Sequence, residues 1–364
     1  DDLYGETYLP RKFKIGVGHQ FDNSIDIYTQ DIGIMPVFNG QLMGFNILVG
    51  GGLGSHHRQS QTFPRLADEL GMCNEEDVVQ VVRQIVEIQR DYGCRTNRKR
   101  ARMKYLLDEW GVEKFRGELE SRLGFKLSDY HKVKINSIDD YYGWHEQKDK
   151  GKFFCGIFVE NGRIKDKDSV LLKTGLARII SHFNIESRLT ATQDLILVNI
   201  NEPDIEKINQ MFDEFNIDIH KGFSIMRKAS MACPALPTCS LAMAESERYL
   251  PTLMDDLEKR GYGNERIKIR MSGCPNSCSR PPVSEIGLIG ATTGKYNIYL
   301  GGDFYGTRLN RLFLELVEDS ELANTISKLI DFWKENKKDE LETFGDFCND
   351  QDFNKLKEVV GRDV

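Results

Sequence analysis

The first 50 residues alternate between apolar and polar positions in a way that predicts β-strands. Residues 12–18 form one such stretch, and the runs at 32–37 and 41–49 predict two more strands. Asn39-Gly40 lies between the last two and is a strong signal for a tight type I′ turn. The chain therefore begins with a strand followed by a β-hairpin.

After residue 70 the apolar residues recur at the spacing of an α-helix. A helix is predicted from a cap at Asn74 to a stop at Gly93, and a second around residues 115–123 ends at Gly124. Residues 126–152 are polar, and we expect a domain boundary in that stretch.

Strands and helices of similar length then alternate, which indicates a small α+β layer. The predicted strands are 153–159, 188–192 and 195–200, and the predicted helices are 174–183 and 203–215. Asn161-Gly162 marks a further hairpin. In the last third the pattern predicts helical residues at 241–261, interrupted at Pro251, a strand at 267–271, and helices at 308–317 and 321–333.

The chain contains an internal repeat. Residues 31–35 (DIGIM) are echoed by 285–289 (EIGLI), and residues 45–51 (FNILVGG) by 296–302 (YNIYLGG). A glycine turn lies between the two echoes in both copies, at Asn39-Gly40 and at Gly294-Lys295. Chance similarity is the alternative interpretation, but the shared order, spacing and terminal Gly-Gly favour one supersecondary unit that occurs twice.

The two copies differ in their chemistry. The second copy carries Cys274 and Cys278 after its first strand, and the first copy has no cysteine there. The first copy instead has Lys12 and Lys14 on alternate positions, so that both side chains point the same way. A pair of copies of this kind predicts a reaction site at the seam between them, although solvated strand lysines are the alternative.

These patterns predict an α+β protein of three units, at 1–147, 148–222 and 223–364, with the repeat in the first and last. The formal net charge of −7 argues against a nucleic-acid surface. No apolar run reaches the roughly 20 residues of a membrane span. Eight cysteines are too sparse for a disulfide scaffold, which favours a reducing compartment such as the cytoplasm. The chain begins without Met, and we expect it to be a segment of a longer protein.

Four cysteines form two loop motifs: Cys233 and Cys239 in one, Cys274 and Cys278 in the other. Their spacing is Cys-x5-Cys, a long gap, and Cys-x3-Cys, in loops rich in Gly, Pro, Ser and Thr. Soft thiolates suit zinc or an iron–sulfur cluster. Structural zinc sites favour tighter spacings, and wider ones serve a cluster. Four inert buried thiols are the third interpretation.

The sequence segments around these cysteines resemble those of a known protein family. Ser230-Met-Ala-Cys-x5-Cys-x-Leu-Ala-Met-Ala-Glu245 and Gly273-Cys-Pro-Asn-x-Cys-x-Arg280 resemble the signature of the sulfite and nitrite reductases that carry sirohaem and a [4Fe–4S] cluster. The resemblance runs over nearly the whole chain and is closest to the assimilatory sulfite reductase haemoproteins, which are longer. It implies that Cys233, Cys239, Cys274 and Cys278 hold the cluster, with Cys278 also axial to the sirohaem iron. It further implies two sirohaem-type repeats around a ferredoxin-like half-domain.

The resemblance also suggests roles for polar residues. Lys12 and Lys14 match lysines that face the open side of the sirohaem. Because sirohaem is a polycarboxylate, the basic run at 95–102 offers the candidate partners Arg95, Arg98, Lys99 and Arg102, with a solvated face as the alternative. The stretch 188–193 (RLTATQ) resembles a sirohaem-contacting strand, so Arg188 and Gln193 are candidates, although Asp194 stands where the family usually has Asn.

A loop after the first hairpin adds further candidates. Gly50, Gly51 and Gly52 let the backbone approach another group closely or bind an anion through their amides, with a flexible loop as the alternative. His56 and His57 are candidate metal ligands, with a plain loop role as the alternative. Cys73, Cys94, Cys155 and Cys348 lack partner spacing and are expected to be structural.

The implied function is the six-electron reduction of sulfite to sulfide, with electrons from a flavoprotein subunit or from ferredoxin. A ferredoxin-type nitrite reductase is the alternative enzyme; those members tend to show Lys-x-Asn where this chain has Lys12-Phe-Lys14. A zinc-stapled, non-catalytic binding module is the alternative from another class. Two arginines that the family draws from its N-terminal part are not in this chain, so the substrate pocket is expected to be incomplete here.

Overall fold

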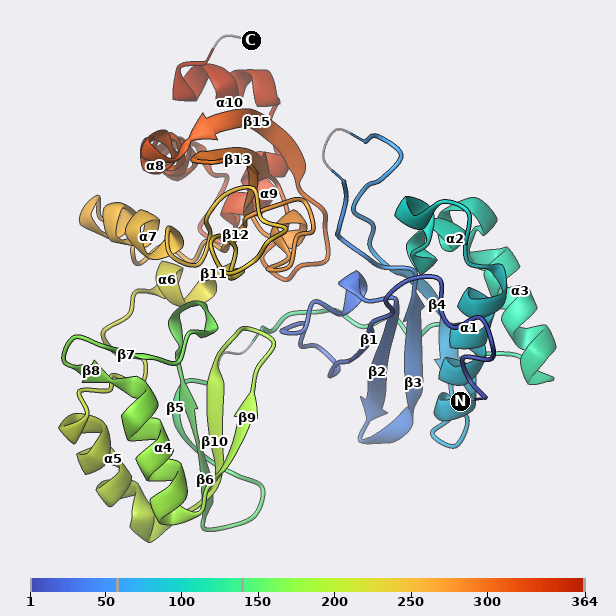
Figure 1. The fold of residues 1–364 in the computed structure, drawn as a ribbon, viewed down its shortest axis with the longest axis horizontal. Helices are drawn as coiled ribbons and strands as arrows, with labels where there is room; N and C mark the ends of the chain where they lie inside the picture. Colours follow the sequence, from blue (N-terminus) through green and yellow to red (C-terminus); the bar gives the residue numbers. More distant parts are fainter. Residues whose placement is uncertain (1, 57–58, 139–140, 363–364) are drawn as a thin grey trace.

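The computed structural model describes residues 2–56, 59–138 and 141–362, which form three α+β units (Figure 1). The first contains a four-stranded sheet in the order β1-β2-β3-β4, with β1 parallel to β2 and the other neighbours antiparallel. Its elements are β1 (Ile15–Val17), η1 (Ile27–Thr29), β2 (Ile32–Asn39), β3 (Gln41–Val49), β4 (Asp68–Cys73), α1 (Val78–Tyr92), η2 (Arg98–Arg100), α2 (Met103–Trp110) and α3 (Val112–Leu123). Apolar residues of the sheet and of α1 to α3 form one buried core.

The middle unit packs two helices against an antiparallel sheet in the order β5-β6-β10-β9 (Figure 1). Its elements are β5 (Gly143–Glu146), β6 (Lys152–Ile157), η3 (Glu160–Gly162), β7 (Asp166–Lys167), β8 (Val170–Leu171), α4 (Leu172–Phe183), β9 (Glu186–Leu189), β10 (Leu195–Asn201), η4 (Glu202–Asp204) and α5 (Ile205–Glu214). The two helices bury one face each against the sheet and form a separate core with it. This core includes Leu176, Ile179, Ile208 and Phe212 of the helices and Cys155 and Leu197 of the sheet.

The last unit contains a five-stranded sheet in the order β11-β12-β13-β14-β15. Its elements are α6 (Ile225–Ala229), β11 (Met231–Ala232), α7 (Leu250–Lys259), β12 (Ile269–Ser272), η5 (Pro281–Val283), β13 (Ile286–Thr292), β14 (Lys295–Leu300), β15 (Arg311–Glu318), α8 (Asp319–Asn336), α9 (Phe344–Asp350) and α10 (Phe353–Val360). Apolar residues of β12 to β15 pack with those of α7, α8, α9 and α10 in the third core.

The internal repeat is confirmed by the pairing of the strands. β12-β13-β14-β15 repeats the order of β1-β2-β3-β4, with a parallel first pair and antiparallel pairs after it. Ile15 pairs with Ile32 in the first copy, as Ile269 pairs with Ile286 in the second. Ile15 lies on the edge strand β1 and is 48% exposed. Ile269 lies on β12, between β11 and β13, and is fully buried in the third core.

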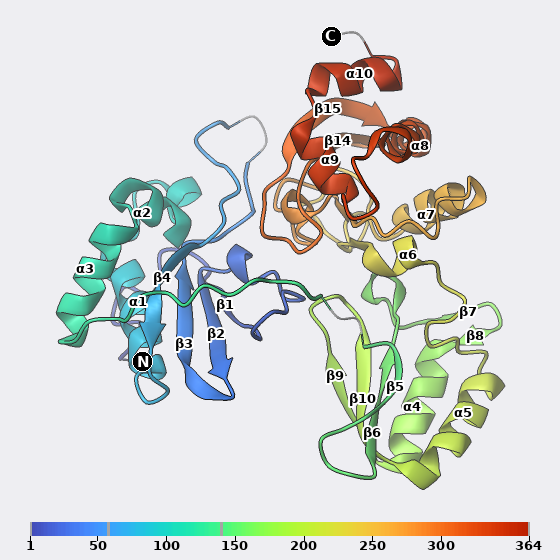
Figure 2. The same cartoon turned by 180° about the vertical axis from the view of Figure 1, so that it is seen from behind.

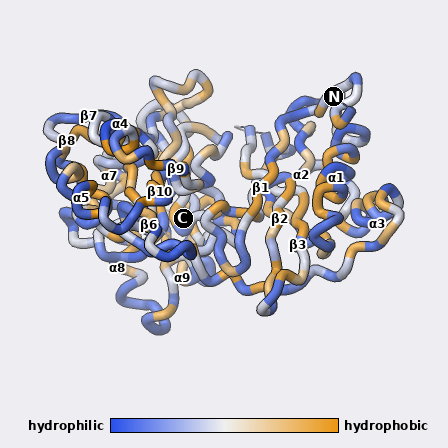
Figure 3. The backbone as a smooth tube through the Cα atoms, turned by 90° about the horizontal axis from the view of Figure 1, so that it is seen from below, coloured by the Kyte–Doolittle hydropathy of each residue, from blue (hydrophilic) through white to orange (hydrophobic). Residues whose placement is uncertain are grey.

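The connection between the first and middle units crosses the back of the molecule (Figure 2). It leaves α3 and reaches β5, which pairs with β6. The middle sheet thus begins before residue 147, where the sequence predicted the first boundary, and we propose that the boundary lies ahead of β5. Figure 3 shows hydrophobic stretches in the strands and alternating hydrophobic and hydrophilic stretches along the helices. Among the helices of the described residues, none is long and apolar enough to cross a membrane.

Several predicted elements are wrong. Residues 308–317, predicted as a helix, contain strand β15, whose sequence RLFLELVE pairs with β14. Helix α7 begins only at Leu250, with Pro251 in its first turn, because proline suits a helix start better than its interior. Asn161-Gly162 lies in the single turn η3 and not in a hairpin between two strands. Helix α2 and strand β4 were not predicted.

Candidate functional site

The two cysteine loops lie side by side because β11 and β12 are parallel neighbours. Met231 pairs with Arg270 and Ala232 with Met271, so the loops that follow these strands leave the sheet together. The amide of Gly273 donates a hydrogen bond to the sulfur of Cys233 at 3.3 Å, which links one loop to the other. Gly273 has no room for a side chain, since a Cβ would lie 2.5 Å from the carbonyl oxygen of Ala244.

The four thiols share one electrostatic environment. Burial raises the pKa of Cys274, and the thiolates of Cys278, Cys233 and Cys239 raise it further. Burial also raises the pKa of Cys278, which Lys12 and Lys14 oppose. Within the described residues, no group of three or more His, Cys, Asp or Glu side chains is arranged to hold a single metal ion.

A cavity of about 240 Å³ lies at the seam between the first and last units. Lys12, Lys14 and Cys278 line it together, so the strand lysines of one copy face the last cysteine of the other. Further cations of its wall are Arg11, Arg98, Lys99, Arg102 and Arg280. Such a wall attracts anions and polycarboxylates.

The surroundings of Lys14 change its pKa. Burial lowers its pKa, and the neighbouring charges of Lys12, Arg102 and Arg280 lower it further, whereas Asp31 opposes them. A lysine with a lowered pKa is a better proton donor near neutral pH. Lys14 can therefore supply positive charge and a transferable proton at one place.

Not every predicted contact lies at this cavity. Arg95 is directed away from it and donates hydrogen bonds to the carbonyl oxygens of Thr7, Tyr8 and Arg90. Its guanidinium thus holds the N-terminal segment, and its role as a cofactor contact stays a prediction. Arg98, Lys99 and Arg102 do line the cavity.

The glycines Gly50, Gly51 and Gly52 do not offer free amides to an anion. Their N–H groups donate to the carbonyl oxygens of Asp31, Gln30 and Arg65, respectively. Gly51 does approach another backbone segment closely, since a Cβ there would lie 2.3 Å from the carbonyl oxygen of Tyr28, whereas a cofactor contact of these glycines stays a prediction. The loop beyond them does reach the cavity, at Leu53, Gly54, Ser55 and His56. His57 lies outside the described residues.

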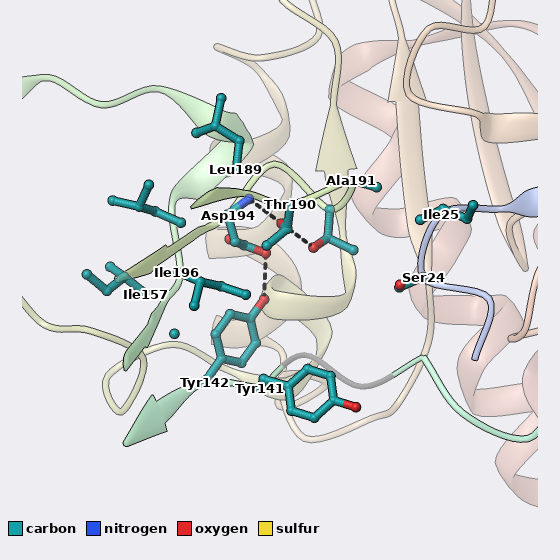
Figure 4. A pocket seen from close by; sticks show the side chains of 13 residues that line it. Ser24, Ile25, Tyr141, Tyr142, Ile157, Leu189, Thr190, Ala191, Asp194 and Ile196 are labelled. Carbon is teal, nitrogen blue, oxygen red and sulfur yellow. Dashed lines mark hydrogen bonds between the residues drawn. The ribbon is translucent and has the colours of Figure 1, made fainter. Parts of the chain in front are cut away.

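Arg188 and Gln193 do not line the cationic cavity, although Gln193 binds the backbone next to Cys233. Arg188 lies on the exposed strand β9, and the Nε2 of Gln193 donates to the carbonyl oxygen of Ala232 at 2.9 Å. The residues between them line a separate cavity of about 300 Å³ (Figure 4). In it, the hydroxyl of Tyr142 donates to Asp194 at 3.0 Å, next to Thr190. Asp194 is thus held inside the middle unit and away from the cationic cavity.

Arg11, Tyr105 and Arg280 are among the polar residues of the cavity that the sequence did not single out as site residues. Arg11 is adjacent to Lys12, and Arg280 belongs to the second cysteine motif, so the sequence motifs could have identified both as site residues. Tyr105 lies in the unpredicted helix α2 and carried no signal. The four remaining cysteines lie apart from the site, with Cys73, Cys155 and Cys348 buried and Cys94 half-buried.

The site is thus bipartite, with the thiols and Arg280 on one repeat and the other cations on the other repeat. A family model described as "Nitrite and sulphite reductase 4Fe-4S domain" matches residues 1–127 and 227–364. A second, "Nitrite/Sulfite reductase ferredoxin-like half domain", matches residues 145–215. The chain therefore belongs to the nitrite and sulphite reductase family.

Individual relatives agree with this assignment. The chain is 47% identical to the "Sulfite reductase [NADPH] hemoprotein beta-component" of Oceanobacillus iheyensis over 95% of its length, and 42% identical to that of Bacillus subtilis. It spans 61% of the length of these relatives. The solved structure of the Mycobacterium tuberculosis NirA protein matches with a TM-score of 0.77 at 23% identity, covering 98% of this chain and 67% of that one, which supports the fold.

Family membership implies a [4Fe–4S] cluster and sirohaem, and the residues present fit both. Four thiols on adjoining loops supply the donor set of a cluster, and an amide already donates to one sulfur, as is common around such clusters. The cationic cavity borders Cys278 and suits a polycarboxylate macrocycle. This fit favours the iron–sulfur interpretation of the cysteines over zinc.

Proposed function

We propose that the protein containing this chain reduces sulfite to sulfide, with Cys233, Cys239, Cys274 and Cys278 as cluster ligands and Cys278 also bound to the sirohaem iron. The observation that carries the proposal is the cavity in which Lys12 and Lys14 face Cys278. The names of relatives at 42–47% identity support the same activity.

The reaction sets the requirements of the site. Hydrogen sulfite takes up six electrons and six protons and yields hydrogen sulfide anion and three water molecules. When bound, the coupled cluster and sirohaem supply electron storage and an iron that binds sulfur. The protein must hold the anion and deliver protons as oxygen leaves.

The residues of the cavity suit these tasks. Lys12 and Lys14 supply fixed positive charge for the anion, and the lowered pKa of Lys14, caused first by burial, eases donation of its proton. The lining of the cavity by Arg98, Lys99 and Arg102 supports the proposal that they pair with carboxylates of the sirohaem. Because the chain spans 61% of its relatives, we propose that further cations of the pocket come from the rest of the protein.

The electron donor follows from chemistry and from the relatives' names. Those names specify NADPH and a beta-component. NADPH gives up a hydride, which carries two electrons, whereas a cluster accepts electrons singly. We therefore propose a flavoprotein partner that divides the electron pair, in preference to ferredoxin.

The test uses the full-length protein. We expect visible absorption of sirohaem, iron and sulfide in cluster stoichiometry, and faster oxidation of reduced methyl viologen with sulfite than with nitrite. Cys278→Ser should abolish the coupled spectrum, whereas Cys94→Ser, a control remote from the site, should leave it unchanged. Faster turnover of nitrite would favour the nitrite reductase alternative, and a colourless zinc protein would overturn the proposal.

A further inference from the structure

Asp31 is a fully buried carboxylate beneath the cationic cavity, and it joins two parts of its wall. Its Oδ2 accepts hydrogen bonds from the backbone amide of Lys14 at 2.9 Å and from Nη2 of Arg102 at 2.6 Å. Its Oδ1 accepts from Nε of Arg102 at 3.2 Å. The guanidinium is thus held by two parallel hydrogen bonds, the geometry that fixes its orientation.

The two partners come from distant parts of the chain. Lys14 immediately precedes β1, and Arg102 lies 71 positions after Asp31, at the residue that precedes α2. Both partners carry positive charge, and Arg102 lowers the pKa of Lys14. Burial raises the pKa of Asp31, and Arg102 and the amide of Lys14 oppose that rise by stabilising its negative charge.

The second copy of the repeat shows which part of this arrangement is special. There Glu285 occupies the position of Asp31, and its Oε2 accepts the amide of Lys268 at 2.9 Å, as Asp31 accepts that of Lys14. Its other oxygen accepts the amide of Gly345 at 2.8 Å, and no arginine of the described part of the chain pairs with it. Anchoring of the strand is therefore common to both copies, whereas the arginine clamp belongs to the cationic copy alone.

We propose that Asp31 is a positioning residue that holds Arg102 and the backbone of Lys14 at a fixed distance from each other. A cofactor carboxylate at Arg102 and the substrate anion at Lys14 are then bound at a matching distance. This inference rests on the proposed function, which places the cofactor at Arg102 and the anion at Lys14. Asp31 itself acts only through these two residues.

Asp31 has a second effect on Lys14. Burial and the charges of Lys12, Arg102 and Arg280 all lower the pKa of Lys14, and Asp31 is the acid that opposes them. Asp31→Asn removes that opposition, so the pKa of Lys14 falls further. The alkaline limit of sulfite turnover should then move to lower pH, a change that general loosening of the fold does not predict.

The experiment titrates the full-length holoprotein with sulfite and follows the visible spectrum. Partners that orient a binding group typically change affinity ~10–100-fold, so we expect Asp31→Asn to raise the Kd for sulfite by roughly that factor. Arg102→Lys keeps the charge but loses the paired hydrogen bonds, and should act in the same direction. In the double variant the two effects should be less than multiplicative, because the residues act as one unit. Glu285→Gln, the matched change in the other copy, should leave the Kd unchanged.

Two results would overturn the inference. One is an unchanged Kd and pH profile in both Asp31→Asn and Arg102→Lys. The other is an equal rise of Kd in Glu285→Gln, which would mark a general loss of structure. If wild-type protein with intact colour fails to bind sulfite, the proposed function fails instead, and the same variants titrated with inorganic phosphate still decide whether Asp31 orders the cavity.

Discussion

Asp26 and Arg280 occupy equivalent positions in the two copies of the repeat, 254 positions apart, and form an ion pair with each other. Both have left-handed backbones, with φ of 50° and 60°, and both precede a single 3₁₀ turn. Asp26 is fully buried and also pairs with Arg270 at 2.7 Å. Since Arg270 and Arg280 lie on either side of the second cysteine motif, one carboxylate of the first repeat holds both ends of that loop.

Asp26→Asn should strongly destabilise the protein. Burial alone would raise the pKa of Asp26, but Arg270, Arg280 and Lys268 lower it below its ordinary value. Loss of its charge removes the buried carboxylate that Arg270 and Arg280 share, at a typical cost of about 3–5 kcal/mol. Chemical denaturation near neutral pH measures this cost.

The pH dependence provides a second check of the same variant. Because the folded pKa of Asp26 is lowered, its stabilisation is present above its unfolded pKa and is lost as pH falls through the folded value. The gap between wild type and Asp26→Asn should therefore close only in strong acid. Glu318→Gln, which breaks the exposed pair with Lys295, is the control and should cost less than about 1 kcal/mol. An equally small cost for Asp26→Asn would show that the ion pairs of Asp26 with Arg270 and Arg280 do not stabilise the fold.

Short motifs made part of this arrangement predictable from the sequence. Signals that depend on neighbouring residues, such as the hairpin at Asn39-Gly40 and the two cysteine loops, specify local structure directly. The repeat then placed Lys14 at the seam. The pair of Asp31 and Arg102 joins residues 71 positions apart, and no local pattern reports such a contact.

Errors arose where one pattern serves two structures. The sequence of β15 carries apolar residues at spacings that suit a helix as well as a strand, and only its pairing with β14 decides between them. Gly51 illustrates a different limit. Its composition permits either anion binding or close packing, and the carbonyl oxygens that surround it come from residues 28 and 30 of another segment.

Gly51→Ala tests the packing role of that glycine. The added Cβ would lie 2.3 Å from the carbonyl oxygen of Tyr28, so the backbone must move. Overpacking of this kind typically costs about 1–3 kcal/mol, measured as a lower midpoint of thermal unfolding. Gly117→Ala is the control. A Cβ there meets nothing within 4 Å, and the change within helix α3 should stabilise by about 0.5–1 kcal/mol. Equal stability of wild type and Gly51→Ala would show that the loop does not need a glycine.

Glu285 should make stability fall as pH rises toward neutrality. Burial raises its pKa from 4.5 to about 7, although the amides of Lys268 and Gly345 oppose the shift. Between these two values the folded protein binds a proton that the unfolded chain releases, so stability decreases with rising pH by about 3 kcal/mol in all. Glu285→Gln should remove this component. We expect the difference in unfolding free energy between wild type and variant to change between pH 4.5 and pH 7 and to be constant above. A difference that does not vary with pH would mean that Glu285 ionises at its ordinary pKa.

Lys14→Asn should impair sulfite reduction more than nitrite reduction in the full-length enzyme. Sulfite carries more negative charge than nitrite near neutral pH and depends more on the fixed cations of the cavity. Loss of one such charge typically costs on the order of a few kcal/mol of transition-state stabilisation, seen as a fall in kcat/KM. The cysteine ligands lie on the other repeat, so the visible spectrum should survive the change. Lys132→Asn, an exposed lysine outside the cavity, is the matched control and should leave both activities unchanged. Equal losses with both anions would show that Lys14 does not discriminate between them, and loss of the sirohaem absorption would show that this lysine holds the cofactor and not the substrate.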